Sequence, residues 1–359
     1  MRVNILSALL KKMNTYHFPN FAEKLVAWQR EHGRHDFPWQ VRDPYAVWLS
    51  EIMLQQTQAA TVRDYFLRFI RELPTVRDLA AAPQDTVLAL WAGLGYYSRA
   101  RNLHAAAQQI MDEFGGQFPQ TREEWQRLKG VGRSTAAAVT AFAFHARETI
   151  LDGNVKRVLC RIFAQDGDPK SPAFERSLWA LAEQLLPGNA TDMPAYTQGL
   201  MDLGATVCTR SKPKCGDCPM VRQCLAKQQG RIDELPRKKT PVAVRQQTVF
   251  WLLLRRHDGA YWLQKRPNRG IWAGLYCVPE AGSLHELRGL AERLGADGDD
   301  WQEDEAFTHR LTHRLLEIVP YHAVLPPQKQ PAPDESGVWV PSERIREYAL
   351  PTPLAALLK

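Results

Sequence analysis

The stretch Leu128-Lys-Gly-Val-Gly-Arg-Ser-Thr135 breaks a helical pattern with two closely spaced glycines. Just before it, Thr121-Arg-Glu-Glu124 has the spacing of a capping box, which predicts a helix from about Arg122 to Leu128. A second helix is predicted from about Arg133 to His145. Two glycines between helices permit a sharp turn whose N–H groups, backed by the positive end of the next helix, can hold a phosphate. The candidate phosphate-binding hairpin comprises Lys129, Gly130, Val131 and Gly132, although a helical hairpin without function has the same outline.

Four of the six cysteines lie in one short segment with the spacing C-x6-C-x2-C-x5-C. They are Cys208, Cys215, Cys218 and Cys224. Four thiolates can close a tetrahedral zinc site or hold an iron–sulfur cluster. A single C-x2-C knuckle between one long and one medium gap favours a cluster, because ribbon-type zinc sites have two separated knuckles. Two disulfides are disfavoured because nothing marks the chain as secreted.

Length and charge set the broad class. A chain of 359 residues is too long for one ordinary core, so two domains are expected. The net charge of +7 and eleven tryptophans favour an anionic partner, and nucleic acid in particular. No apolar run reaches the length of a membrane span, and the apolar segment Ile5–Leu10 lacks a cleavage site, so the sequence predicts a cytoplasmic protein. Residues 1–18 are interpreted as an extension, with Met13 as an alternative start.

The pattern of apolar residues changes once along the chain, from helical periodicity to short strand-like runs. Helical periodicity dominates from about Phe21 to Ala226, which predicts an all-α domain over 19–226. A basic linker (227–245) precedes a smaller α+β domain (246–345) and a tail (346–359). The smaller domain is expected to contain strands at Thr248–Leu254, Tyr261–Leu263, Leu315–Ala323 and Gly337–Val340, a glycine-rich turn at Gly270–Tyr276 and a helix at Leu284–Leu294.

Two carboxylates are candidates for chemistry. Asp43-Pro44 predicts the start of a helix through Leu54, and Glu51 lies on its apolar face. A carboxylate that points inward needs either a partner or a raised pKa, and a general acid near neutral pH requires the raised pKa. A paired structural glutamate is the alternative. The residues around Asp152 predict that it is a helix N-cap or part of an Asx turn, a role far more frequent than catalysis.

Four motifs carry a resemblance to a known family. W-L-S-E-I-M-L-Q-Q-T-Q (48–58), L-K-G-V-G-R-S-T (128–135), L-D-G-N-V-K-R-V (151–158) and the cysteine segment resemble the helix-hairpin-helix glycosylase superfamily and, within it, the adenine DNA glycosylases of MutY type. The resemblance extends from about Phe21 to the C-terminal domain. It implies one 4Fe-4S cluster on the four cysteines. The implied substrate is adenine mispaired with 8-oxoguanine, or with guanine, in duplex DNA.

The resemblance also implies a mechanism. Adenine leaves the base stack, Glu51 protonates it as a leaving group, and Asp152 stabilises the positive charge that grows on the sugar. A short separation would also permit a transient covalent sugar on Asp152, which the sequence leaves open. Asn154 is implied to help set Asp152. The implied adenine pocket contains His35, Phe37, Trp39 and Gln198.

Ser134 discriminates within the superfamily. Relatives that cut the strand carry a lysine there, which forms a Schiff base with the sugar, and a serine hydroxyl cannot form that imine. The chain is therefore expected to be monofunctional, with at most adventitious lyase activity through Lys156. A pyrimidine-lesion glycosylase and lyase is disfavoured by Ser134 and by the second domain. A non-enzymatic iron–sulfur DNA-binding protein is the alternative of another class.

Several further residues are implied to contact DNA. The loop that contains Tyr96 resembles a wedge that enters the duplex beside the lesion, whereas Tyr97 better fits a buried aromatic position. Gln56 resembles a second intercalating group on the helix of Glu51. The basic residues between the first two cysteines would bind phosphates. They are Arg210, Lys212 and Lys214.

The C-terminal domain resembles the Nudix fold that this family uses as a lesion reader. Gly289 and Arg293 stand where a working Nudix hydrolase needs acidic metal ligands, so pyrophosphate hydrolysis is not expected. The reader loop of the family carries Phe-Ser-His, and this chain has Leu311, Thr312 and His313. That departure keeps a hydroxyl and an imidazole but loses an aromatic ring. The protein is expected to act as a monomer.

Overall fold

The structure is a computed structural model that describes residues 20–238, 243–296, 301–327, 329 and 336–358. The predicted N-terminal extension and Met13 lie outside these residues. The chain forms two compact units. The helical unit comprises residues 20–70, 75–77 and 106–238 of the described part. The sheet unit comprises the rest, and it includes residues 78–105 as well as the C-terminal domain.

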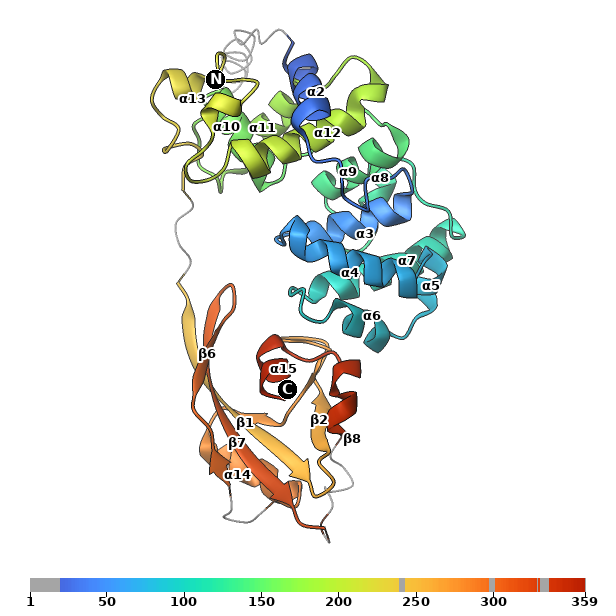
Figure 1. Cartoon of the computed structure of the whole chain (residues 1–359), viewed down its shortest axis with the longest axis vertical. Coiled ribbons are helices and arrows are strands. Elements are labelled where there is room, and N and C mark those ends of the chain that lie inside the picture. Colours follow the sequence, from blue (N-terminus) through green and yellow to red (C-terminus); the bar gives the residue numbers. More distant parts are fainter. Residues whose placement is uncertain (1–19, 239–242, 297–300, 328, 330–335, 359) are drawn as a thin grey trace, which may run out of the picture. The chain divides into compact units, whose positions relative to one another are not determined.

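The described residues up to 238 form helices joined by loops, with no strand among them, as predicted (Figure 1). The α-helices are α2 (Phe21–His32), α3 (Pro44–Leu54), α4 (Ala59–Glu72), α5 (Val76–Ala81), α6 (Gln84–Trp91), α7 (Ser98–Phe114), α8 (Arg122–Trp125), α9 (Arg133–Phe144), α10 (Gly153–Ile162), α11 (Pro172–Gln184), α12 (Met193–Asp202) and α13 (Leu225–Gln228). Short turns are η1 (Ala190–Asp192), the π-helix η2 (Leu203–Val207) and η3 (Cys215–Asp217). Within the described residues, every helix is too short or too polar to span a membrane.

The core of the helical unit fixes the helices that carry the candidate site. Leu25 of α2, Ala138 of α9, Val158 of α10 and Leu200 of α12 belong to one buried apolar cluster. Burial of such side chains contributes about 1.5–3 kcal/mol each, which holds these helices in a defined arrangement. The ends of the loops between these helices are therefore fixed by the core.

The sheet unit is built on two long parallel strands, β1 (Arg245–Arg256) and β7 (Arg314–Leu325). The shorter strands are β2 (Tyr261–Lys265), β3 (Tyr276–Cys277), β4 (Glu280–Ala281), β5 (Gln302–Glu303), β6 (Phe307–Arg310) and β8 (Val338–Val340). All of these strands pair antiparallel with their neighbours. The sequence located β1, β2, β7 and β8. It did not locate β3, β4 and β5, which have two residues each, or β6, which has four.

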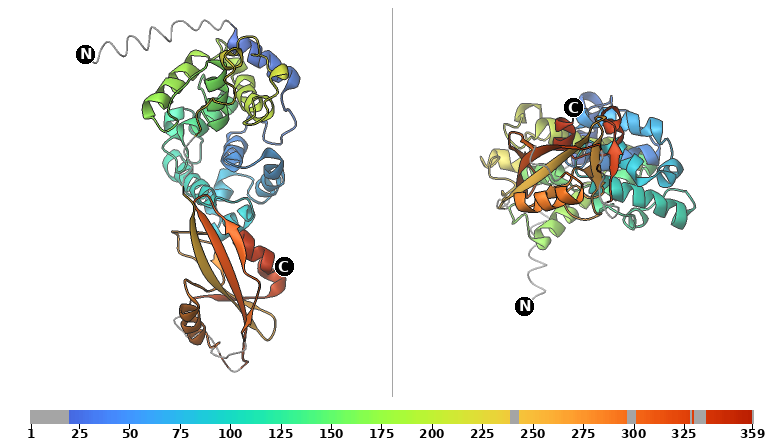
Figure 2. Two further views of the ribbon diagram at one scale, coloured as in Figure 1. Left: turned by 90° about the vertical axis from the view of Figure 1, so that its left-hand side faces the viewer. Right: turned by 90° about the horizontal axis from the view of Figure 1, so that it is seen from below.

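Alternate residues of β1 point to opposite faces of the sheet. Trp251 and Leu253 belong to an apolar cluster with Leu354 of α15 (Thr352–Leu357). Leu252 and Leu254 belong to another with Leu287 of α14 (Leu284–Arg293). The sheet is thus covered by α14 on one face and α15 on the other (Figure 2).

The segment predicted as a C-terminal tail differs from that prediction. Residues 346–358 include the end of η4 (Ser342–Glu347) and all of α15, and Leu350 and Leu354 are buried. The apolar residues of this short segment complete one face of the sheet. They therefore fold as part of the domain.

Candidate active site and nucleic-acid interface

Helix α3 places Glu51 at a pocket. Asp43 caps the helix by accepting hydrogen bonds from the amides of Tyr45 and Ala46, and Pro44 occupies its first turn, as the sequence indicated. Eight of the eleven helix residues are buried. Glu51 lines a cavity of about 500 Å³, which is within the size range of small-molecule sites. The helix ends at Leu54, so Gln56 lies beyond it in an exposed turn at φ 59°, not on the helix as predicted.

The surroundings of Glu51 favour its protonated form. Burial of the carboxyl, and after it the negative charge of Asp152, raise the pKa of Glu51 to about 8. The side chain keeps a partly exposed edge because it borders the cavity. A carboxylic acid that remains protonated at neutral pH can donate a proton to a molecule in the pocket.

Asp152 is both the N-cap of α10 and a neighbour of Glu51. Its Oδ1 accepts a hydrogen bond of 2.8 Å from the amide of Val155. Asp152 is exposed and lies outside the lining of the cavity, but its charge reaches Glu51. Ser134 of α9 accepts a hydrogen bond of 3.1 Å from the amide of Leu151. The hydroxyl of Ser134 therefore positions the backbone directly before Asp152.

Asn154 is held by a half-buried network that the sequence did not indicate. Arg157 donates to Asn154 Oδ1 (2.9 Å), to the carbonyl of Gly204 (2.7 Å) and to the carbonyl of Cys208 (2.8 Å). Gly204 packs so closely that a Cβ on it would lie 2.7 Å from the Cβ of Asn154. The first turn of α10 is thus tied to the start of the cysteine segment.

The predicted pocket residues all line the same cavity as Glu51. His35 Nε2 lies 3.0 Å from the carbonyl oxygen of Gln29. Phe37 and Trp39 stack with their ring centroids 4.8 Å apart. Gln198 donates through Nε2 to Asp202 Oδ1 at 2.9 Å, which leaves its Oε1 as an acceptor.

Sequence reasoning missed Arg34, which lines the pocket, and Asp202, which supports Arg34 and Gln198 from outside the lining. Asp202 is buried and forms a salt bridge of 2.7 Å with Arg34, whose guanidinium also lies over the ring of Phe37. A buried carboxylate in this position fixes both Arg34 and the amide of Gln198. The signal that could have found Asp202 is an acidic residue at the otherwise apolar C-terminal end of α12.

The hairpin has the geometry that its glycines predict. Thr121 and Glu124 form the expected capping box, and Gly130 adopts φ 75°. Within the described residues, the amides of Gly130 and Gly132 donate to no protein group, and both glycines are exposed. The amide of Lys129, by contrast, already donates to Gln109 at 2.8 Å. Two amides of the hairpin are therefore available to an anion such as phosphate.

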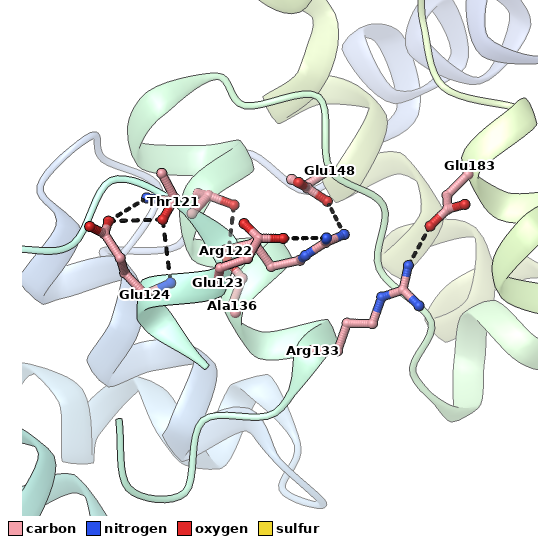
Figure 3. A network of polar contacts seen from close by, with 9 residues as sticks. Thr121, Arg122, Glu123, Glu124, Arg133, Ala136, Glu148 and Glu183 are labelled. Carbon is pink, nitrogen blue, oxygen red and sulfur yellow. Dashed lines mark hydrogen bonds and ion pairs between the residues drawn. The ribbon is translucent and has the colours of Figure 1, made fainter. Parts of the chain in front are cut away.

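Ion pairs brace both sides of this hairpin (Figure 3). Arg122 pairs with Glu148 at 2.7 Å, and Arg133 pairs with Glu183. The guanidinium of Arg133 also lies 3.9 Å from the ring centroid of Trp179 on α11. These contacts hold the two helices of the hairpin relative to α11 and the loop after α9.

The cysteines of the segment lie close enough to influence one another's charge. Burial, and after it the charges of Cys208, Cys224 and Cys215, raise the pKa of Cys218 to about 12. Buried Arg161 supports the segment by donating to Cys208 Sγ (3.5 Å) and to the carbonyls of Thr209 (2.7 Å) and Arg210 (3.2 Å). Among the described residues, no group of three or more histidine, cysteine or acidic side chains converges on the position of a single metal ion.

The basic side chains of this segment are exposed. Arg210, Lys212 and Lys214 point to solvent, and Lys212 adopts φ 50°. Lys156 on α10 instead forms a salt bridge of 2.6 Å with Glu175.

The predicted wedge loop belongs to the sheet unit. Tyr96 is 45% exposed and adopts φ 49°, whereas Tyr97 is buried, as expected from the sequence. The hydroxyl of Tyr97 donates to the carbonyl of Leu350 at 3.3 Å and accepts from the amide of Gly93 at 3.1 Å. Buried Arg99 donates to the carbonyls of Leu94 and Gly95, and burial lowers its pKa to about 10.

The predicted reader residues form the tip of the β6–β7 hairpin. The amide of Leu311 donates to the carbonyl of Arg314 at 2.8 Å, and its side chain packs against the sheet core. Thr312 and His313 are exposed. The hydroxyl of Thr312 lies 3.4 Å from that of Tyr96, so the reader tip and the wedge loop meet within one unit.

Helix α14 lacks the features of a metal box. Glu286 accepts a hydrogen bond of 3.0 Å from the amide of Gly282 and so caps its own helix. Arg293 donates back to the carbonyl of Gly289 at 3.1 Å. Both residues that replace acidic ligands are thus engaged in helix structure.

Comparisons with known proteins agree with this architecture. The family described as HhH-GPD superfamily base excision DNA repair protein matches residues 49–184, and the NUDIX domain family matches residues 250–359. An adenine DNA glycosylase of Buchnera aphidicola subsp. Baizongia pistaciae is 33% identical, over 94% of this chain and 95% of its own. One of Rattus norvegicus is 45% identical, over 60% of this chain and 44% of its own. A thermostable thymine-DNA glycosylase superposes with a TM-score of 0.52 at 30% identity, over 58% of this chain and 95% of that one.

Proposed function

This chain belongs to the adenine DNA glycosylase family, and we propose from that premise that it hydrolyses the N-glycosidic bond of adenine paired with 8-oxoguanine, or with guanine, in duplex DNA. The observation that carries the proposal is Glu51, a carboxylic acid with a pKa of about 8 at the edge of a 500 Å³ cavity. An adenine inside a duplex cannot reach this acid, so the base must flip into the cavity. As a member of this family, the chain is a DNA N-glycosylase of base excision repair.

In the cavity, Glu51 donates its proton to the flipped adenine and makes it a neutral leaving group. The positive charge that develops on the sugar needs a nearby anion, and exposed Asp152 supplies one. The acceptor Oε1 of Gln198 and the stacked rings of Phe37 and Trp39 suit a purine with an amino group and an aromatic face.

The reaction stops at base release. Ser134 is engaged with the amide of Leu151 and offers no amine for attack on the sugar. The nearest basic candidate on α10, Lys156, is paired with Glu175. Borohydride trapping of wild-type protein on substrate should give no cross-link to residues 129–135, and efficient trapping there would contradict a monofunctional enzyme.

Cys208, Cys215, Cys218 and Cys224 are suited to hold one 4Fe-4S cluster. The charges of the neighbouring thiols act on Cys218. A single C-x2-C knuckle between one long and one medium gap favours a cluster over one zinc ion held by four sulfurs. The cluster would cross-link residues 208–224 and so fix the exposed Arg210, Lys212 and Lys214 for phosphate contact.

Iron and sulfide analysis of the purified protein separates these cases. About four irons per chain are expected, with a brown protein. A colourless, active protein with one zinc would refute the cluster.

The sheet unit supplies lesion recognition. Thr312 and His313 offer a hydroxyl and an imidazole at an exposed tip, and Tyr96 stands beside Thr312. Such groups can register the few atoms by which 8-oxoguanine differs from guanine. DNA is therefore the proposed partner, bound by a monomer, and the cytoplasmic location remains a prediction.

Replacement of Glu51 by glutamine tests the function directly. Glu51→Gln keeps the shape of the side chain but cannot donate a proton of comparable acidity. We expect normal binding of an A:8-oxoguanine duplex and a 10²- to 10⁴-fold loss of single-turnover adenine release. The matched control is Glu292→Gln on α14, which should release adenine at the wild-type rate. Near-normal release by Glu51→Gln would remove Glu51 from the mechanism.

A further inference from the structure

His145 ends helix α9 in the left-handed conformation, which histidine adopts more often than most residues but less readily than glycine. It is the C-cap, at φ 57° and ψ 25°, and its amide donates to the carbonyl of Thr140. The left-handed region favours glycine, because a Cβ crowds the neighbouring carbonyl there. A glycine would cap this helix with less strain. The cap alone would therefore be at least as stable with glycine as with histidine.

His145 borders the candidate catalytic cavity and is half-buried. His145 lines the cavity together with Glu51 and Gln198. Its Nε2 is buried, and no group in the described part of the chain forms a hydrogen bond with it. A buried polar atom without a hydrogen-bond partner lowers the stability of the protein. Such an atom needs an explanation, and one explanation is a ligand that supplies the missing hydrogen bond.

We propose that the imidazole of His145 turns when adenine enters the cavity, so that its Nε2 forms a hydrogen bond with the base. This inference rests on the proposed function, because it assigns the purine as the missing partner. A neutral imidazole nitrogen can either donate or accept, and adenine presents both ring-nitrogen acceptors and an amino donor. His145 is thus a binding residue of the adenine pocket, added to the four that the sequence indicated.

The position on α9 gives this contact a structural setting. The same helix begins at the phosphate-binding hairpin with Gly132 as its N-cap, carries Ser134 in its first turn, and ends at His145. One rigid element therefore joins the hairpin, the support of Asp152 and the pocket. A base that enters the cavity meets His145 on a backbone already fixed by the core residues of α9.

His145→Gly separates a binding role from a capping role. Glycine relieves the left-handed strain, so a histidine that serves only as a cap predicts unchanged or higher thermal stability with unchanged base release. We expect unchanged or higher stability together with about a tenfold loss of single-turnover adenine release, the effect of one lost hydrogen bond. His145→Asn, which tolerates this conformation and keeps a polar group, should retain more activity than glycine.

Ala164→Gly is the matched control. Ala164 adopts φ 47° in the same unit but does not line the cavity. It should gain from the same relief of strain and should release adenine at the wild-type rate. Wild-type release by His145→Gly would overturn the proposal.

Binding of free adenine provides a readout that does not depend on catalysis. Millimolar adenine should raise the melting temperature of the wild-type protein, and it should raise that of His145→Gly by less. Equal shifts in the two proteins would count against the contact. A wild-type protein that releases no adenine from the duplex would instead refute the proposed function, and the adenine shift would still test His145.

Discussion

Helices α3 and α14 have eleven and ten residues, and each carries glutamate in a sequence that suggests a site. In α3, eight residues are buried and Glu51 borders a cavity. Burial raises the pKa of Glu51 to about 8, with a further contribution from the charge of Asp152. In α14, only Leu287 and Ala291 are buried. Its Glu286 caps the helix, and Glu292 is exposed.

The difference between the two helices is one of surroundings. The same side chain becomes a proton donor where protein displaces water around it, and remains an ordinary surface charge where it does not. The proposed chemistry therefore lies in the helical unit. Recognition is the proposed role of the sheet unit, which has the Nudix fold but lacks acidic residues at Gly289 and Arg293.

Asp152→Asn provides the largest test of this division. Asparagine caps a helix as well as aspartate does, so α10 and the melting temperature should be unchanged. Loss of the charge should lower the rate of adenine release by about 10²- to 10³-fold, as for removal of other electrostatic stabilisers of a transition state. Single-turnover assays with A:8-oxoguanine measure the effect. A rate within threefold of wild type would place the chemistry elsewhere.

A double replacement in the sheet unit should affect recognition alone. Thr312→Ala with His313→Ala removes contacts worth on the order of 1–3 kcal/mol each. The preference for A:8-oxoguanine over A:G should fall roughly tenfold to a hundredfold, while release from A:G changes little. Equal losses on both duplexes, with a lower melting temperature, would indicate damage to the fold of the hairpin.

The pH dependence of adenine release sharpens the contrast between the two glutamates. Glu51 must be protonated to act, so the single-turnover rate should fall about tenfold per pH unit above about pH 8. In Asp152→Asn the fall should begin at lower pH, because the charge of Asp152 is the second cause of the raised pKa. Glu292→Gln should leave the profile unchanged. A wild-type rate that is constant to pH 9.5 would contradict the acid role.

The smallest effect concerns stability. Between its ordinary pKa of 4.5 and about 8, Glu51 is protonated in the folded protein and ionised in the unfolded chain. Its contribution to stability is therefore lost as pH rises through this range. Glu51→Gln removes that loss. The free energy of unfolding of the variant, relative to that of the wild type, should therefore increase from pH 5 to pH 8. The increase should be on the order of 2 kcal/mol after allowance for the partly exposed side chain. Calorimetry at both pH values measures it, and an equal advantage at both would contradict the shift.

The sequence was informative where local chemistry decides structure. The Asp43-Pro44 cap, the capping box at Thr121 and the glycines of the hairpin each specify a backbone conformation within a few residues. The apolar pattern around Glu51 likewise indicated a carboxylate that faces inward. For the whole fold, the resemblance of the motifs and the later matches lead to the same family.

What could not be predicted depends on contacts between distant residues. Nothing local to Asp202 or Arg157 identifies their partners, which lie far away in the sequence. Residues 78–105 belong to the sheet unit through contacts such as Tyr97 with Leu350 and Lys265 with Asp85. His145 gave no signal either, because its importance lies in a backbone angle and an unpaired nitrogen.

The parallel pairing of β1 with β7 has a consequence for how the chain folds. Arg245 pairs with Arg314, 69 residues later, and the ladder continues in this register to Arg256 and Leu325. Contacts between such distant residues form slowly, because a long loop must close before any of them is gained. During synthesis, the apolar run of β1 therefore leaves the ribosome well before its partner exists. This strand is where we expect a nascent chain to depend most on chaperones.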